Sequence, residues 1–359
     1  MKKATKILGS VRNADCPVRL TAVKAEGEGS LSINTVEDMK LITISLFASV
    51  MEEGTVTIPS RYLRILDDME GQITIEKAKD CLAIKGASSY SVPFYSGEIA
   101  QMRESLPVGS VTFELREIKD LFRKVIFATG DDDEYGFDCI LLECASDCIK
   151  AVCTDRRIIA ISRLKKGSPY KGSFLLHKSG VNVLSKIDGD MITMTFFEDI
   201  ESRSKRKAVQ FSVSGEIMVD ILMPEFSLIF PRCEEVLDLK TNTTLSGAKG
   251  DFLRAIGDNR KLSREVTVSL WHTGYVKNKP RLSSREDNGA STVETYVDLD
   301  WRGDDIKTKL NAKTFESAIA HCDGRAIVRF SSDKGPLFIG GEDDSYLCVM
   351  MPYTAAEKR

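Results

Sequence analysis

The sequence has few histidines and lacks the motifs of the common enzyme classes. Only three histidines, His177, His272 and His321, occur in 359 residues, and none lies in a nucleophile or ligand pattern. There is no G-x-x-x-x-G-K-[ST] loop and no H-E-x-x-H motif, the signals of P-loop NTPases and zinc metalloproteases. We therefore expect a protein that is not an enzyme and that uses no cofactor or metal.

Long apolar runs are also lacking. No window approaches the roughly eighteen uncharged apolar residues of a membrane-spanning helix, and the first residues, MKKATKILGSVR, lack the apolar core of a signal peptide. With 42% hydrophobic and 29% charged residues, the composition is typical of a globular protein. These features predict a cytoplasmic protein without membrane contacts.

The nine cysteines follow no disulfide or zinc pattern. Their number is odd, and four lie in the stretch CILLECASDCIKAVC, at Cys139, Cys144, Cys148 and Cys153. The stretch is typical of a β-hairpin, in which the two cysteines of each strand point to opposite faces. It contains no C-x-x-C and no histidine. We predict reduced cysteines in a core and no metal site.

One pattern occurs three times along the chain. In each copy a strand-like run ends at a single residue, apolar residues then recur at helical spacing, and a glycine turn follows. The copies are marked by Pro59, His177 and Asn311. Their turn glycines lie twelve or thirteen residues later, at Gly71, Gly189 and Gly324. The repeat predicts three α+β units rich in antiparallel strands, at residues 1–105, 106–243 and 244–359.

The expected helices carry most of the positive charge. Six helices are predicted, at 1–12, 60–70, 114–126, 177–187, 249–261 and 307–321, and together they sum to +10, so that the rest of a chain of net charge −3 carries −13. Arg116, Lys119 and Arg123 share one face of their helix. Charged helix faces are often simply exposed to solvent. The same bias toward positive helices in three repeats, however, favours a shared anionic partner. We expect 103–110 to be a linker, and the basic stretches 202–207 and 277–285 to be hairpin tips.

Several segments carry a resemblance to a known family. The run CTDRRIIAISR stands where the bacterial DNA polymerase III β subunit, the sliding clamp, has a Thr-Asp-Gly-His-Arg-Leu-Ala run. The segment DILMPEFSLIFPRCEEVL resembles that family's stretch ending in Phe-Pro-x-Tyr, and the tail SYLCVMMPY resembles its Tyr-x-Val-Met-Pro-Met ending. The order and spacing of these segments, over nearly the whole chain, make the resemblance specific.

The resemblance implies a ring of two three-domain subunits joined head to tail, with antiparallel sheets outside and helices lining a channel for duplex DNA. Tyr90 and Val92 would lie on the edge strand at the subunit interface. Such a clamp would hold DNA without reading its sequence and would tether the replicative polymerase, giving processivity. The cations that would line the channel are Lys2, Lys3, Lys6, Arg12, Arg61, Arg64, Arg116, Lys119, Arg123, Lys124, Lys178, Lys186, Lys249, Arg254 and Lys313.

The resemblance also implies a groove between the second and third domains that binds short peptides of the polymerase and the clamp loader. Arg156 replaces a glycine and Ile158 an arginine of the family pattern. An alternative interpretation is that Val349, Met350 and Met351 end a core strand. The matching groove residues are Phe137, Thr154, Arg156, Arg157, Ile159, Val349, Met351, Pro352 and Tyr353.

Two other functions stay open. The chain could be a non-enzymatic assembly or regulatory protein with the clamp fold that does not serve the main replicase. Less favoured is an enzyme without a recognisable motif. Binding to nicked circular DNA would test the clamp hypotheses.

Overall fold

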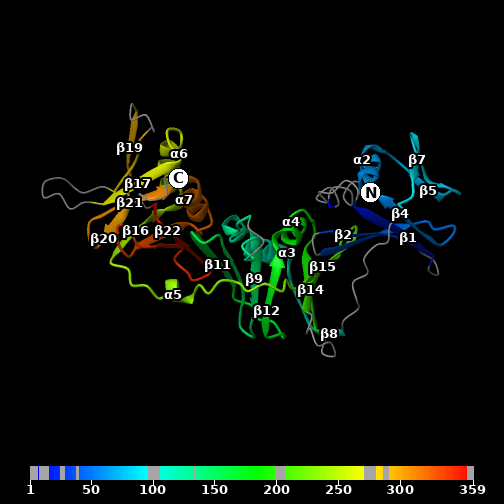
Figure 1. The fold of residues 1–359 in the computed structure, drawn as a ribbon, viewed down its shortest axis with the longest axis horizontal. Coiled ribbons are helices and arrows are strands. Elements are labelled where there is room, and N and C mark those ends of the chain that lie inside the picture. The colour runs from blue at the N-terminus through cyan, green and yellow to red at the C-terminus, as the bar shows by residue number, and fades with distance from the viewer. Residues whose placement is uncertain are drawn as a thin grey trace. The chain divides into compact units, whose positions relative to one another are not determined.

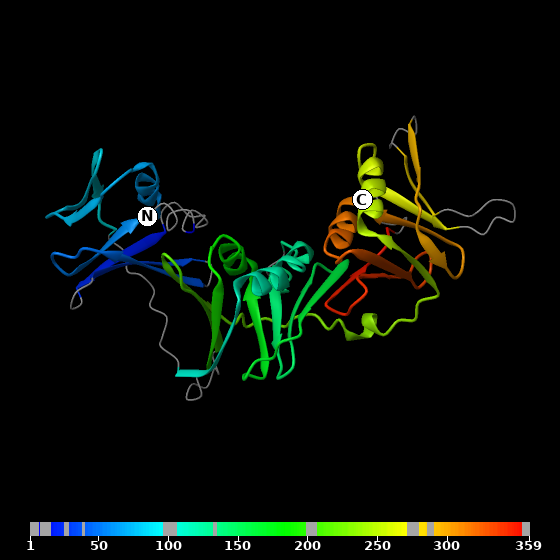
Figure 2. The ribbon, with the colours of Figure 1, turned by 180° about the vertical axis from the view of Figure 1, so that it is seen from behind.

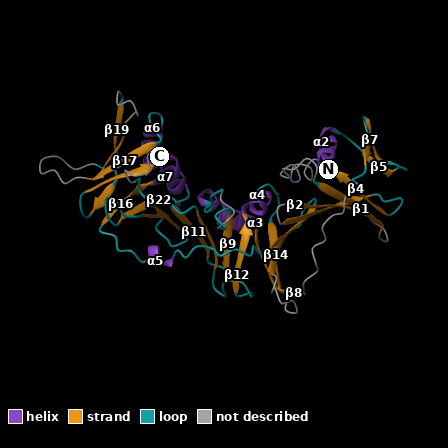
Figure 3. Cartoon of the chain, in the orientation of Figure 1, coloured by secondary structure: helices purple, strands orange, loops and turns teal. Residues whose placement is uncertain are grey.

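The computed structural model describes residues 7, 16–24, 29–37, 40–95, 106–131, 135–198, 207–270, 280–285 and 291–353 (Figure 1). Antiparallel strands dominate and helices are few (Figure 3). The chain forms two compact units. Unit 1 comprises Met1–Asp120, Glu143–Asp147 and Gly167–Ser227, and unit 2 comprises Leu121–Leu142, Cys148–Lys166 and Leu228–Arg359. The boundaries of the three predicted domains remain a prediction.

Unit 1 is built on an eight-stranded antiparallel sheet in the order β4-β1-β2-β3-β15-β14-β13-β8. The first four strands join the last four where β15 pairs with β3, with Ile221 opposite Ile42 and Val219 opposite Ile44. All four side chains are buried, so this junction is part of the core. The strands are β1 Pro17–Lys24, β2 Gly29–Glu37, β3 Lys40–Ala48, β4 Gly54–Pro59, β8 Leu106–Glu114, β13 Met191–Glu198, β14 Lys207–Val213 and β15 Met218–Pro224.

Smaller elements complete unit 1. A three-stranded sheet has the order β5-β6-β7, and short helices follow β4 and β12. These elements are the 3-10 helix η1 Ser60–Arg64, α2 Ile65–Asp68, β5 Thr74–Lys77, β6 Cys81–Lys85, β7 Ser89–Pro93, β12 Gly172–His177 and α4 Lys178–Leu184. Helix α3, Leu115–Arg123, crosses the boundary between the two units.

Unit 2 holds strands in the order β9-β10-β11-β24-β23-β22-β16-β20 and a separate four-stranded sheet in the order β19-β18-β17-β21. Helices α6 and α7 lie side by side in both views (Figures 1 and 2). The helices are η2 Ile126–Ala128, α5 Glu234–Leu237, α6 Lys249–Arg260 and α7 Ala312–Ala320. The strands are β9 Cys139–Cys144, β10 Ile149–Thr154, β11 Ile158–Leu164, β16 Thr243–Ala248, β17 Glu265–Leu270, β18 Arg281–Arg285, β19 Thr292–Tyr296, β20 Asp300–Arg302, β21 Ile306–Asn311, β22 Arg325–Phe330, β23 Leu337–Gly340 and β24 Tyr346–Met350.

The repeated strand-to-helix junction is confirmed. Pro59, His177 and Asn311 each end a strand and act as the N-cap of the next helix, with φ/ψ of −64/139, −67/136 and −69/115. His177 Nδ1 accepts from the Ser179 backbone N–H at 3.3 Å, and Asn311 Oδ1 accepts from the Thr314 N–H at 3.0 Å. Because the extended cap residue belongs to both elements, strand and helix meet without a loop.

The cysteine stretch forms the predicted strands, β9 and β10, and Cys139, Cys144 and Cys153 are buried. All nine cysteines carry free thiols. In the part of the chain that the structure describes, no group of three or more His, Cys, Asp or Glu side chains could hold a metal ion. No described helix is long and apolar enough to cross a membrane.

Two loop predictions were wrong in part. Residues 106–110, expected in a linker, belong to β8, which pairs with β13 through a register shift at Phe196/Phe197 next to Pro107. Proline and glycine are tolerated there because β8 is an edge strand with a bulge. Residues 281–285, expected at a hairpin tip, form β18. The stretches 1–6, 8–15, 201–206 and 277–279 lie outside the described residues, and with them most of the first predicted helix.

Candidate partner-binding and DNA-binding residues

The loop between β10 and β11 is a tight turn held by its own aspartate. Asp155 Oδ1 accepts from the backbone N–H groups of Arg157 and Ile158, each at 2.9 Å. The Arg156 N–H donates to Thr154 Oγ1 at 3.3 Å. This turn leaves Arg156 with φ 79, the one positive φ of a non-glycine residue in the described part of the chain. The strained position falls where the family pattern has glycine, which adopts this backbone readily.

Arg156 folds its side chain over two aromatic rings. Its guanidinium carbon lies 4.9 Å from the ring centroid of Tyr135 and 4.7 Å from that of Phe137. The two ring centroids are 6.1 Å apart. Phe137 is buried, whereas Tyr135 is 51% exposed. The predicted groove residues Phe137 and Arg156 are therefore in contact, and Tyr135, which no sequence motif indicated, completes the cluster.

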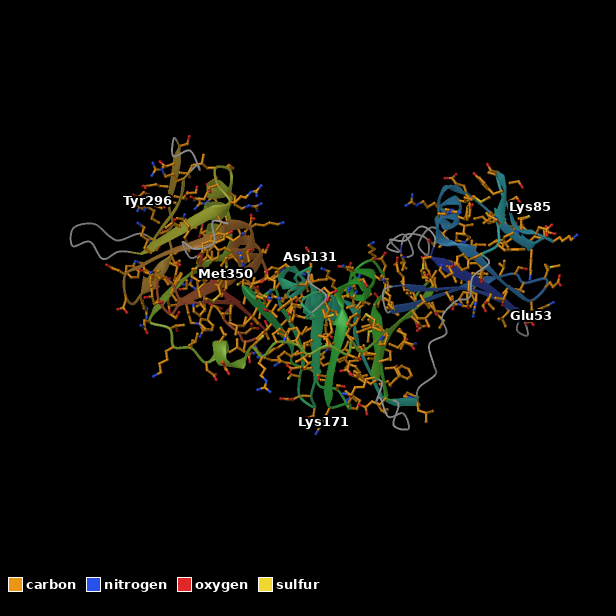
Figure 4. The ribbon with its side chains drawn as sticks, in the orientation of Figure 1. Glu53, Lys85, Asp131, Lys171, Tyr296 and Met350 are labelled. Atoms are coloured by element: carbon orange, nitrogen blue, oxygen red, sulfur yellow. The ribbon has the colours of Figure 1, made fainter. Side chains whose placement is uncertain are left out.

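Strand β24 brings the C-terminal groove residues to the same loop. In its pairing with β11, Ile159 lies opposite Val349 and Ile158 opposite Met350. The backbone N–H of Met351 then donates to the Arg157 carbonyl at 2.8 Å. Val349 and Met350 (Figure 4) are buried, as expected of core residues that end a strand, but Met351 is 42% exposed. Met351 thus presents an apolar side chain beside the Arg156 loop.

Tyr353 is attached to a different part of unit 2. Its N–H donates to the Lys309 carbonyl at 2.8 Å, and its hydroxyl accepts from Asn311 Nδ2 at 2.8 Å. Tyr353 therefore lies against β21, next to the N-cap of α7. Pro352 is buried and Tyr353 half-buried. Thr154 is buried, Ile159 is half-buried, and Arg157 is exposed.

The predicted cations of α3 have partners within the protein. Arg116 Nε pairs with Glu114 at 2.5 Å, and Lys119 Nζ donates to the Ile187 carbonyl. The Nη1 atom of Arg123 lies 3.2 Å from Nδ1 of His321. Lys124 is only 5% exposed, and its ammonium pairs with Asp323 at 2.7 Å. The side chains of Arg116 and Arg123 are exposed, whereas the ammonium of Lys124 is paired with Asp323, just after the end of α7.

The other predicted channel cations differ in exposure. Lys249 is half-buried, and its ammonium donates to the carbonyls of Ala320 and Cys322 at 3.3 and 2.8 Å. Because Ala320 ends α7 and Cys322 follows it, Lys249 satisfies acceptors at a helix C-terminus. Lys178 is half-buried too. The exposed cations are Arg61, Arg64, Lys186, Arg254 and Lys313. Lys2, Lys3, Lys6 and Arg12 lie outside the described residues.

The predicted interface residues lie on β7, an edge strand of its three-stranded sheet. Tyr90 lies opposite Ile84, and Val92 opposite Leu82. Tyr90 is 37% exposed and Val92 is fully buried. Along this edge the backbone of β7 can pair with another strand.

No protein-family model matches the sequence, and no curated protein matches it. Solved structures, however, share its fold. The DNA polymerase III beta subunit of Thermotoga maritima matches with a TM-score of 0.82 at 16% identity, over 99% of this chain and 97% of that one. The subunit from Pseudomonas aeruginosa gives 0.82 at 16%, over 98% and 97%. A DnaN sliding clamp of Bartonella birtlesii bound to griselimycin gives 0.81 at 16%, over 98% and 97%. The chain therefore has the sliding-clamp fold.

Proposed function

We propose that the protein is a sliding clamp, a ring of two copies that encircles duplex DNA and tethers a DNA polymerase to it. The observation that carries the proposal is the TM-score of 0.82 to a DNA polymerase III beta subunit over 99% of the chain. A closed ring holds DNA by topology, so it needs no catalytic group, cofactor or metal. The tether raises the effective concentration of the polymerase at its template. Two head-to-tail contacts close a symmetric dimer, with Tyr90 and Val92 at the contact.

The DNA contacts in this proposal are made by exposed and half-buried cations on or beside the helices. Contacts of Lys and Arg with phosphates carry no sequence information, and they exchange readily, so the ring slides. Lys124 is left out of the set because its side chain is buried and paired. The described members are Arg61, Arg64, Arg116, Lys119, Arg123, Lys178, Lys186, Lys249, Arg254 and Lys313.

Charge reversal on α3 tests this assignment. The double change Arg116→Glu and Arg123→Glu alters two exposed side chains on one helix face. We expect weaker binding to duplex DNA of any sequence, with the slope of log affinity against log salt smaller by about 0.9 for each phosphate that is no longer neutralised. Lys171→Glu, at an exposed lysine beside β12 (Figure 4), is the control. An unchanged salt slope in the double variant, or the same change in the control, contradicts the assignment.

The partner site in this proposal is formed by the Arg156 loop and the end of β24. Short peptides with apolar anchors suit a surface where the adaptable side chain of Met351 lies beside the loop whose Arg156 covers two aromatic rings. Met351→Ala tests it, with Met191→Ala as a control of similar exposure, 42% against 47%. We expect only the first to weaken binding of a polymerase-tail or clamp-loader peptide by calorimetry, with equal thermal stability. Equal peptide affinities would place the partner site elsewhere.

A second candidate function is favoured by one observation. Arg156 occupies, under strain, the glycine position of the family pattern and covers Phe137, so the protein could use the clamp fold for partners other than the main replicase. This function would be supported if the protein encircles DNA while neither the original protein nor the Arg156→Gly variant binds a polymerase-tail peptide.

A further inference from the structure

The segment that follows β24 joins two sheets of unit 2. Strand β24 lies between β11 and β23, whereas β21 is an edge strand of the sheet β19-β18-β17-β21. The Met351 backbone N–H donates to the Arg157 carbonyl, just before β11, and the Tyr353 N–H donates to the Lys309 carbonyl of β21, each at 2.8 Å. Between them Pro352 is buried. Proline has a fixed φ and no N–H to satisfy, so the three residues are held at both ends.

A side-chain hydrogen bond strengthens the attachment to β21. Asn311 Oδ1 accepts from the Thr314 backbone N–H at 3.0 Å, which makes Asn311 the N-cap of α7. Only an oxygen can accept this bond, so the other amide atom of Asn311 is the nitrogen. That nitrogen donates to the Tyr353 hydroxyl at 2.8 Å. One amide group therefore holds both the start of α7 and the C-terminal segment.

Tyr353 is placed differently from Met351. The hydroxyl of Tyr353 is bonded within the protein, and its side chain is half-buried. Met351, two residues earlier, is 42% exposed. Because Pro352 limits the flexibility of the segment, the position of the Met351 side chain depends on where Tyr353 is attached.

We propose that Tyr353 is a positioning residue, whose bond with Asn311 latches the C-terminal segment and so holds Met351 at the partner site. The inference rests on the proposed function, in which Met351 contacts a short peptide. A segment that is already held in its bound conformation loses less freedom on binding. The apparent affinity falls with the fraction of molecules in which the segment is displaced. Breaking the latch should therefore weaken peptide binding without removing a group that touches the peptide.

Two substitutions in the full-length protein break the latch in different ways. Tyr353→Phe keeps the ring and removes the hydroxyl. Asn311→Ser keeps an N-cap, since serine caps a helix about as well as asparagine, but it has no second polar atom for Tyr353. Each should weaken binding of a polymerase-tail peptide about three- to tenfold by calorimetry, as expected for one hydrogen bond. The double variant should bind no more weakly than either single variant, because both changes remove the same bond.

A third substitution should restore the latch. In Asn311→Asp one carboxylate oxygen can cap α7 and the other can accept from the Tyr353 hydroxyl, so peptide affinity should stay within about twofold of the original. Tyr296→Phe, at an exposed tyrosine of unit 2, is the control and should have no effect. If Tyr353 were instead a peptide anchor through its ring, Tyr353→Phe and Asn311→Ser would both leave the affinity unchanged. That result overturns the proposal.

Amide hydrogen exchange tests the latch without a peptide. The Tyr353 N–H is held by the Lys309 carbonyl. By mass spectrometry of a fragment that spans Tyr353, its exchange should be about three- to tenfold faster in Tyr353→Phe and Asn311→Ser, and unchanged in Asn311→Asp. Equal exchange in all variants overturns the latch.

The two assays together separate this inference from the proposed function. If exchange becomes faster while a peptide that requires Met351 binds with unchanged affinity, Tyr353 does not position the partner site, and the proposal is overturned. If the original protein binds no polymerase-tail peptide, the proposed partner site fails instead, and the exchange rates alone decide whether Tyr353 latches the segment.

Discussion

Substitutions at Arg156 separate two opposing energies in the loop after β10. With φ 79, any residue that carries a Cβ is strained by ~1–2 kcal/mol relative to an unstrained backbone. The guanidinium over Tyr135 and Phe137 offsets part of this strain, by ~0.5–1 kcal/mol for a contact at an exposed site. Arg156→Ala removes the ring contacts and keeps the strain, whereas Arg156→Gly removes both.

The two variants should therefore differ in an unusual direction. Relative to Arg156→Ala, Arg156→Gly gains ~1–2 kcal/mol from released strain and loses ~0.4–1 kcal/mol because glycine makes the unfolded chain more flexible. The glycine variant should be the more stable by ~0.5–1 kcal/mol. At a position with ordinary negative φ, the alanine variant would be the more stable one.

Urea unfolding at constant pH measures the difference. Arg157→Ala and Arg157→Gly form the control pair, because the next residue of the same turn does not have a positive φ. In that pair the alanine variant should have the larger free energy of unfolding. If Arg156→Ala is as stable as Arg156→Gly or more stable, the backbone of Arg156 is not strained, and the strain assigned to the loop is wrong.

Three further substitutions test the packing, the charges and the caps. Gly303→Ala should lower the free energy of unfolding by more than ~2 kcal/mol, because at φ 115 the new Cβ would clash with the Asn242 carbonyl oxygen. Gly250→Ala, with open space around it, should not. Burial raises the pKa of Glu225, so its ionised form lowers stability above that pKa. Glu225→Gln should stabilise the protein at pH 7, and pH-dependent urea unfolding should show the gain vanishing as pH falls through the raised pKa. Asn311→Ala, which removes the N-cap of α7, should cost ~1 kcal/mol in the same unfolding assay.

The repeated junctions could be predicted because their signals are local. At Pro59, His177 and Asn311 a strand pattern changes to a helix pattern within one residue, and the caps that form there need only neighbours two or three positions away. The same locality explains why the hairpin of β9 and β10 was predicted correctly. Its two strands, CILLEC and IKAVCT, are mostly buried, and only four residues separate them along the chain.

The missed strands depend on distant partners. Residues 106–110 contain Pro107 and Gly109, and 281–285 are rich in serine and arginine, so their composition indicates loops. Both become strands because a neighbouring strand, β13 or β17, offers a free edge. Composition alone does not report such an edge.

The candidate site was located from the family resemblance, but its contacts required the structure. Nothing in the sequence indicated that Tyr135 would stack under Arg156, since that contact follows from the left-handed turn. Lys124 was predicted to line the DNA channel because of the family resemblance. Its partner Asp323 lies 199 positions away along the chain, beyond the reach of any local pattern.

Retention on circular DNA tests the proposed clamp function most directly. The protein is incubated at high concentration with a nicked circular plasmid, separated by gel filtration in moderate salt, and compared before and after one restriction cut. We expect the protein to elute with the circle and to be released when the circle is linearised, because a ring slides off a free end. Equal retention on circular and linear DNA, or no retention on either by a protein that light scattering shows to be a dimer, would contradict the clamp proposal.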